Sequence, residues 1–163
     1  MTRKAGLPPV AGPDARLLIL GSLPGDASLA AAQYYGHPQN AFWRLIGAVL
    51  DEDLVPLPYE ARLERLRQRR VALWDVIGAA HRVGSLDTAI KNHEANDLAG
   101  LIARLPELQM VGFNGGTAAK LGRKALGETP LRLIDLPSSS PAFTRPFAEK
   151  LAVWKLLREG LEP

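Results

Sequence analysis

A short stretch of this sequence, QYYGHPQNAFW at residues 33–43, crowds polar and aromatic side chains together. Its histidine and asparagine, His37 and Asn40, can donate and accept hydrogen bonds, and its tyrosines offer rings that could stack on a flat ligand. Each residue also has a simpler structural interpretation, because Asn40 stands where the N-cap of a helix is expected and His37 precedes a proline in a turn. The stretch therefore indicates either a ligand site or a reinforced helix start.

Three further segments place small and polar residues directly after apolar runs. They are GSLPG from Gly21, FNGG with Asn114, and SSSPAF from Ser138. Glycines let backbone N–H groups approach a ligand closely, an asparagine presents a donor beside an acceptor, and serines can contact a phosphate backbone. As turns or helix caps, the same residues would have a purely structural role. GSLPGDAS lacks the GK[ST] ending of a nucleotide-binding P-loop and the G-x-G-x-x-G spacing of a dinucleotide site.

Apolar runs alternate with amphipathic stretches along the chain, which predicts an α/β fold with a parallel sheet covered on both faces. The expected strands are 15–22, 71–77, 108–114 and 130–137, and the expected helices are 27–35, 40–50, 58–70, 94–105, 116–127 and 147–160. In such folds ligands gather at the carboxyl ends of the strands. The three loops and Asp75, near the end of the second strand, should therefore meet at one edge of the sheet.

Composition narrows the class of protein. The chain has 163 residues and no cysteine, which excludes disulfides, thiol catalysis and cysteine-ligated metal sites. Its three histidines show no metal-ligand spacing, so we expect neither metal nor cofactor. An apolar run long enough to span a membrane is absent, and we expect a cytoplasmic protein. The net charge of +3 permits an anionic partner without requiring one. We expect residues 1–14 to form a mobile arm and residues 15–163 to form one domain.

Taken in order, these motifs resemble those of the uracil-DNA glycosylase superfamily and, within it, the hypoxanthine-DNA glycosylase family. The matching segments, between about residues 16 and 146, are GSLPGDASL, QYYGHPQNAFWRLI, ALWDVIGA, GSLDTAIKN, FNGGTA and LPSSSPA. The resemblance implies a three-layer α/β/α sandwich around a central four-stranded parallel sheet. It also implies a monofunctional, metal-free enzyme that acts as a monomer on DNA containing a deaminated base.

The resemblance also implies roles for individual residues. In mismatch-specific relatives, the third residue of the G-x-x-P-G loop is an asparagine that holds the catalytic water. Leu23 occupies that position here and cannot bind water, so the role passes to Asn40. Tyr35 would stack on the flipped base, and Asn114 would read its edge. The other expected base contacts are Gly21, Ser22 and Leu23, and the expected DNA contacts are Pro24, Gly25, His37, Ser138, Ser139, Ser140, Pro141 and Phe143.

Several alternatives stay open at this point. Hypoxanthine and uracil both present a carbonyl beside a ring N–H, so one amide could read either base, and a uracil-directed glycosylase is an alternative. A nucleotide-binding α/β module without catalysis is another. Asp26, Asp75 and Asp87 are the carboxylates expected near the site. Phe143 departs from the SPAN pattern usual in the family, and the basic helix end near Arg70 could face either solvent or DNA.

Overall fold

A four-stranded parallel sheet forms the centre of the protein. The computed structural model describes residues 2–23, 25–82 and 90–162. The strands are β2 (Leu17–Gly21), β3 (Val71–Asp75), β6 (Met110–Asn114) and β7 (Arg132–Leu136), in the order β3-β2-β6-β7. Both central strands, β2 and β6, are completely buried, as their unbroken apolar sequences predict. The strands predicted from the apolar runs are confirmed.

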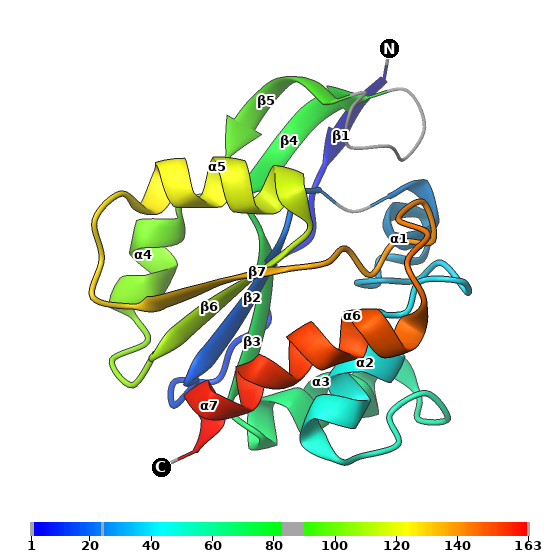
Figure 1. The fold of residues 1–163 in the computed structure, drawn as a ribbon. Helices are drawn as coiled ribbons and strands as arrows, with labels where there is room; N and C mark the ends of the chain where they lie inside the picture. The colour runs from blue at the N-terminus through cyan, green and yellow to red at the C-terminus, as the bar shows by residue number, and fades with distance from the viewer. Residues whose placement is uncertain (1, 24, 83–89, 163) are drawn as a thin grey trace.

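Helices cover both faces of this sheet (Figure 1). Alternate side chains of a strand point to opposite faces, and in β2 they reach two separate hydrophobic clusters. Leu17 and Ile19 pack with the cluster under one group of helices, and Leu18 and Leu20 with the cluster under the other. The first group is α2 (Phe42–Leu50), α3 (Tyr59–Gln68) and α6 (Phe147–Trp154), and the second is α4 (Leu98–Ala103) and α5 (Gly116–Leu126). This arrangement confirms the three-layer α/β/α sandwich.

The helix expected at 27–35 is shorter than predicted. The structure has α1 at Asp26–Ala31, and Ala32 ends it in the left-handed conformation with φ 53°. The backbone N–H groups of Ala32 and Gln33 donate to carbonyls of Leu29 and Ser28 in α1. These bonds give the carbonyls at the end of the helix the partners that a C-cap supplies. The residues that follow form turns rather than helix, and Tyr35 also has a positive φ of 55°. These turns present the polar residues of the 33–43 stretch.

The C-terminal helix expected at 147–160 is also interrupted. The structure divides it into α6, a 3₁₀ turn named η2 (Lys155–Leu157) and α7 (Arg158–Leu161).

A second, antiparallel sheet was not predicted. Its strands are β1 (Thr2–Ala5), β4 (Ile77–Arg82) and β5 (Ile90–Ala95), in the order β1-β4-β5. Part of the segment expected to form a mobile arm, residues 1–14, thus belongs to a sheet. Val10 is buried and exchanges backbone hydrogen bonds of 2.9 and 2.8 Å with Leu73. That residues 15–163 form one domain stays a prediction.

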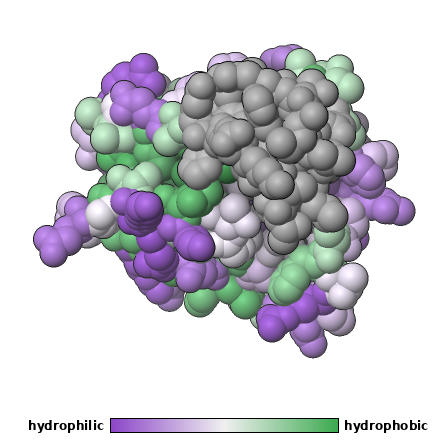
Figure 2. Space-filling view, turned by 90° about the horizontal axis from the view of Figure 1, so that it is seen from above, coloured by the Kyte–Doolittle hydropathy of each residue, from purple (hydrophilic) through white to green (hydrophobic). Residues whose placement is uncertain are grey.

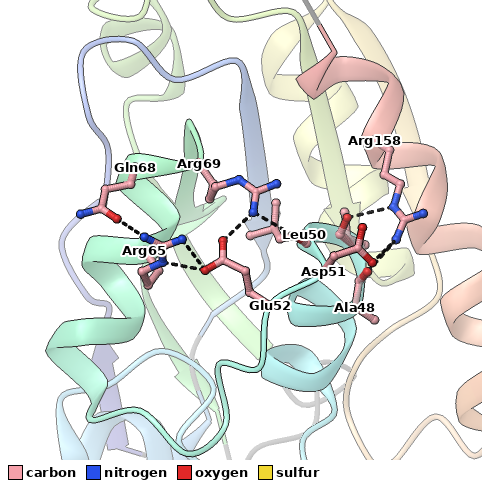
Figure 3. A network of polar contacts seen from close by, with 9 residues as sticks. Ala48, Leu50, Asp51, Glu52, Arg65, Gln68, Arg69 and Arg158 are labelled. Carbon is pink, nitrogen blue, oxygen red and sulfur yellow. Dashed lines mark hydrogen bonds and ion pairs between the residues drawn. The ribbon is translucent and has the colours of Figure 1, made fainter.

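The basic end of α3 lies at the far end of the sheet from the carboxyl ends of the strands, because β3 begins directly after it. Arg65 and Arg69 both pair with Glu52, each at 2.5 Å, and Arg69 also donates to the carbonyl of Leu50 (Figure 3). Arg158 donates to the carbonyls of Ala48 and Val49. These arginines supply hydrogen-bond donors to carbonyls in the last turn of α2, where backbone partners become scarce.

One face of the molecule mixes hydrophilic and hydrophobic residues. On the face seen from above, hydrophilic side chains form the outermost points and hydrophobic residues lie between them (Figure 2). Among the described residues, no helix is long and apolar enough to cross a membrane.

Candidate active site

A cavity of about 600 Å³ opens at the carboxyl ends of the parallel strands. Figure 1 shows the segment after β7 approaching α1 and the turns that follow it on this side of the sheet. The cavity brings together almost all of the site residues predicted from the sequence: Gly21, Ser22, Leu23, Gly25, Tyr35, His37, Asn40, Asp75, Asn114, Ser138, Ser139, Ser140, Pro141 and Phe143. Pro24 and Asp87 lie outside the described residues, and only the backbone of Asp26 is described.

The cavity lies where parallel α/β sheets usually bind ligands. The chain leaves β2 and β6, which are neighbours, in opposite directions, and the crevice between such strands is open at their carboxyl ends. Gly21 ends β2 there. A Cβ atom at Gly21 would lie 2.6 Å from Asp75 Oδ1 and 3.1 Å from the Tyr35 hydroxyl. The absent side chain therefore allows a carboxylate and a phenol to approach the strand end closely.

Asn40 lies one residue before the N-cap of α2, which is Ala41 rather than Asn40 as the sequence predicts, and it also lines the cavity. Its Oδ1 accepts a 2.9 Å hydrogen bond from the N–H of Phe42, at the start of α2. The next residue, Ala41, donates its backbone N–H to the carbonyl of Ser139 at 3.0 Å. A carboxamide oxygen has a second lone pair, and its nitrogen carries two hydrogens. The hydrogen bond from Phe42 therefore leaves the amide of Asn40 with the capacity to bind water in the cavity.

Asn114 is paired with one residue of the serine loop, which we define as residues 138–143. Its Nδ2 donates to Ser139 Oγ and its Oδ1 accepts from the Ser139 N–H, both at 2.9 Å. Both residues are buried. A backbone N–H can only donate, so Oδ1 must face it, and this fixes the orientation of the amide. One N–H and one lone pair of Asn114 are left by this pairing.

The two tyrosines of the 33–43 stretch have different environments. Tyr35 lines the cavity, and its ring stacks on Phe42 with centroids 3.9 Å apart and 14° between the planes. Tyr34 is 3% exposed and donates its hydroxyl to the carbonyl of Pro8 at 2.7 Å. Burial raises the pKa of Tyr34 far above its ordinary value, and the charge of Asp75 raises it further. Both tyrosines line the cavity, but Tyr34 is protonated and its hydroxyl is bonded within the core, whereas the ring of Tyr35 is less deeply buried.

The first loop contributes an apolar residue where mismatch-specific relatives have a water-holding amide. Leu23 is 6% exposed and packs against Ile77, with Leu121 beside them. The backbone of this loop is hydrogen-bonded to the segment that follows β3. The N–H groups of Val76 and Ile77 donate to the carbonyls of Gly21 and Ser22. The loop therefore has a fixed position at the cavity wall.

His37 is exposed, and its Nδ1 accepts a 3.1 Å hydrogen bond from the N–H of Gln39. This bond matches the turn-buttressing interpretation, although His37 also lines the cavity.

Sequence reasoning missed Lys150, which supports the serine loop from α6. Its Nζ donates to the carbonyl of Ser140 at 3.2 Å and lies 5.4 Å from the ring centroid of Phe143. Burial lowers the pKa of Lys150, and the nearby charge of Arg44 lowers it further. A signal was available, since Lys150 falls on the same helical stripe as the apolar residues of α6.

Residues 8–158 match the profile of the Uracil DNA glycosylase superfamily. The chain belongs to this superfamily. This glycosylase is 43% identical to a hypoxanthine DNA glycosylase of Methanosarcina barkeri, over 93% of its own length and 96% of that protein's. It is 41% identical to a hypoxanthine DNA glycosylase of Methanosarcina acetivorans, with the same coverage.

A solved structure agrees with the family assignment. The solution NMR structure of a Methanosarcina acetivorans protein, assigned as a uracil DNA glycosylase, superposes with a TM-score of 0.87 at 38% identity. The match covers 99% of this glycosylase and 100% of that chain. The protein is therefore a hydrolase of N-glycosidic bonds, and its substrate is DNA.

Proposed function

We propose that this glycosylase removes hypoxanthine, the product of adenine deamination, from DNA. The observation that carries the proposal is that two carboxamides, Asn40 and Asn114, line one cavity in a chain so similar to proteins named hypoxanthine DNA glycosylase. A base inside a duplex cannot be reached by protein groups that must act on its glycosidic bond, so the damaged nucleotide is extruded into the cavity. A cavity of about 600 Å³ is large enough for a bicyclic base.

In this mechanism Asn114 reads the edge of the extruded base. Hypoxanthine offers a carbonyl and an adjacent ring N–H, which match the N–H and lone pair of Asn114 that Ser139 leaves. Because Ser139 fixes the orientation of the amide, the donor and acceptor are presented in a defined order. Adenine has an amino group in place of the carbonyl, so its donor would face the donor of Asn114. Undamaged adenine is thereby rejected.

Cleavage of the glycosidic bond leaves positive charge on the sugar and negative charge on the departing base. Asn40 orients the attacking water, although an amide is a poor base. Most of the rate enhancement then comes from groups that stabilise the separating charges in a site that excludes water. Asp75 is 3% exposed and lines the cavity, and its carboxylate can stabilise the cationic sugar.

The rim of the cavity holds the DNA. The backbone and hydroxyl groups of the serine loop can contact phosphates beside the extruded nucleotide. Phe143, at the end of this loop, is 38% exposed and can fill the gap left in the base stack. Action as a monomer in the cytoplasm belongs to the same proposal.

Uracil-directed excision stays the alternative substrate, because Asn114 alone cannot distinguish uracil from hypoxanthine. The size of the base is what separates them, since a small pyrimidine fills less of the cavity.

The reaction should need no metal ion. We expect the purified protein to release hypoxanthine from duplex DNA at the same rate with and without an excess of EDTA, because carboxamides and the protein's own charges carry the chemistry. Alkaline cleavage of the abasic product, resolved on a denaturing gel, measures this release. Loss of activity in EDTA that a divalent metal restores would contradict the metal-free mechanism.

Substitution of Tyr35 should weaken capture of the extruded base. Tyr35→Ala removes the ring, and the apparent Kd for DNA carrying hypoxanthine should rise roughly 5- to 150-fold, as expected for about 1–3 kcal/mol of stacking. Tyr35→Phe keeps the ring and serves as the matched control, with nearly wild-type affinity. Equal losses in both variants would show that the hydroxyl, and not stacking, is what matters.

A further inference from the structure

Many basic residues of this glycosylase are neutralised by carboxylates. Such ion pairs join Arg65 and Arg69 to Glu52, Arg67 to Glu64, Arg70 to Asp14, Arg123 to Asp135, Arg132 to Glu159 and Arg158 to Asp51.

Four basic residues around the mouth of the cavity are held differently. We call Arg44, Arg62, Arg145 and Lys150 the basic strip. Each lies against an aromatic ring. Arg44 Cζ lies 4.8 Å from the centroid of the Phe147 ring, and Arg62 Cζ lies 5.3 Å from the centroid of the Trp43 ring. Arg145 Cζ and Lys150 Nζ lie 5.5 and 5.4 Å from the centroid of the Phe143 ring. Among the side chains that the structure describes, none of the four forms an ion pair with a carboxylate.

The members of the strip are connected through the second hollow, the buried Lys150 and the ring of Phe143. Arg44 and Arg62 line a second hollow of about 320 Å³, which shares Tyr35, His37 and Asn40 with the main cavity. The charge of Arg44 reaches Lys150, whose pKa it lowers. Lys150 and Arg145 then meet at the ring of Phe143. Positive charge therefore extends from the second hollow to the end of the serine loop.

This arrangement suits an anionic ligand. Like charges placed together without a counter-ion repel one another, and an anion bound between them relieves that repulsion. Guanidinium groups match the geometry of phosphate oxygens and can bind two of them at once. Arg62 is further fixed by donating its Nε to the carbonyl of Leu57 at 2.9 Å. The second hollow is thus lined by two cations whose orientation is already constrained by the protein.

We propose that Arg44 and Arg62 bind, in this second hollow, a backbone phosphate of the DNA strand that carries the extruded nucleotide. The wall shared with the main cavity contains Asn40, so the bound phosphate would lie next to the nucleotide being cleaved. Lys150 adds its charge nearby while its Nζ donates to the carbonyl of Ser140 in the serine loop. This proposal rests on the proposed function, because it takes damaged DNA as the substrate.

Arg44→Gln is the test variant, because the side chain of Arg44 is exposed and rests on Phe147 without a structural ion pair. Arg67→Gln is the matched control, because it makes the same charge change on α3, where Arg67 pairs with Glu64. Binding of each full-length variant to a duplex that carries an uncleavable abasic-site analogue is measured across a series of salt concentrations. The slope of log Kd against log salt should fall by about 1 for Arg44→Gln and stay at the wild-type value for Arg67→Gln. An unchanged slope for Arg44→Gln would overturn the proposal.

A second measurement locates the phosphate. Duplexes with an uncleavable abasic-site analogue carry a neutral methylphosphonate at one position of the damaged strand at a time. At one position beside the analogue, replacing the phosphate by a methylphosphonate should weaken binding of the wild-type protein. The same replacement should not weaken binding of Arg44→Gln further, because that variant has already lost its contact with this phosphate. Additive losses at every position would refute a phosphate site at Arg44. Both measurements follow binding and not base release. Failure of the proposed function would therefore be seen in a different experiment, in which the wild-type protein leaves hypoxanthine DNA uncleaved.

Discussion

Asn40→Ala should slow the single-turnover release of hypoxanthine by about 10²- to 10³-fold, the usual effect of deleting one preorganised polar group. The amide is expected to orient the attacking water, and alanine offers nothing to replace it. The same substitution removes the hydrogen bond from the Phe42 N–H, which should cost about 1 kcal/mol of unfolding free energy. The variant should therefore fold and bind DNA. Rates are measured with enzyme in excess over a labelled duplex, and stability by urea denaturation.

Asn40→Ser separates the two roles of this residue. A serine caps a helix about as well as an asparagine, so unfolding free energy should return to near the wild-type value. Its hydroxyl is shorter than the carboxamide and would leave the water site displaced, so the rate should stay low. If serine restores the rate together with the stability, Asn40 acts only as a helix cap.

A wild-type rate in folded, DNA-binding Asn40→Ala would place the catalytic group elsewhere, and Asp75 would be the next residue to test. Restoring an asparagine at position 23 in the Asn40→Ala variant asks whether the loop can resume the water-holding role. Leu23 packs against Ile77, so the added amide would also disturb an apolar cluster. Partial recovery of the rate would support a transfer of function between the two positions.

Asn114→Asp should lower the excision rate by about 10²-fold or more, because a carboxylate has no hydrogen to donate to the base carbonyl and repels the departing anion. Its contact with Ser139 can survive. One oxygen still accepts from the Ser139 N–H, and the Ser139 hydroxyl can rotate to donate to the other. Single-turnover rates at several pH values measure the effect. Protonation of the carboxyl restores a donor, so the deficit should shrink as the pH falls.

Asn114→Ala is the comparison that distinguishes base reading from loop positioning. Alanine removes both hydrogen bonds to Ser139 and leaves the buried N–H of Ser139 without its acceptor, which should cost about 1–3 kcal/mol of stability. If Asn114 only positions the serine loop, the aspartate variant keeps its activity and the alanine variant loses it. If Asn114 reads the base, both variants lose activity, and binding to undamaged DNA is little changed in the aspartate variant.

The sheet and its functional edge could be predicted because both follow from local features of the sequence. Apolar runs at β2, β3, β6 and β7 are clear in the sequence, and parallel strands necessarily bring their following loops to one edge. The small sheet could not be predicted in this way. Strand β1 pairs with β4 through backbone hydrogen bonds, which leave no hydrophobic pattern in a segment such as TRKA.

Parts of the site depend on contacts between residues distant in the sequence. The pairing of Asn114 with Ser139 joins positions 25 residues apart, and nothing in either motif alone indicates it. The aromatic support of Arg44 by Phe147 joins α2 to α6 and is equally invisible in the sequence. The motifs thus gave the residue types of the site, and the tertiary structure gives their hydrogen-bond partners.

Base selectivity tests the proposed function most directly. Duplexes that differ only in one base, hypoxanthine, uracil, xanthine or thymine, are incubated with excess wild-type protein in EDTA, and the abasic product is cleaved with alkali. We predict that hypoxanthine is released fastest, because it combines the hydrogen-bonding edge that Asn114 matches with a size that suits the cavity. Rapid release of uracil from DNA, with the hypoxanthine strand left intact, would contradict this assignment and favour a uracil-directed enzyme on the same fold.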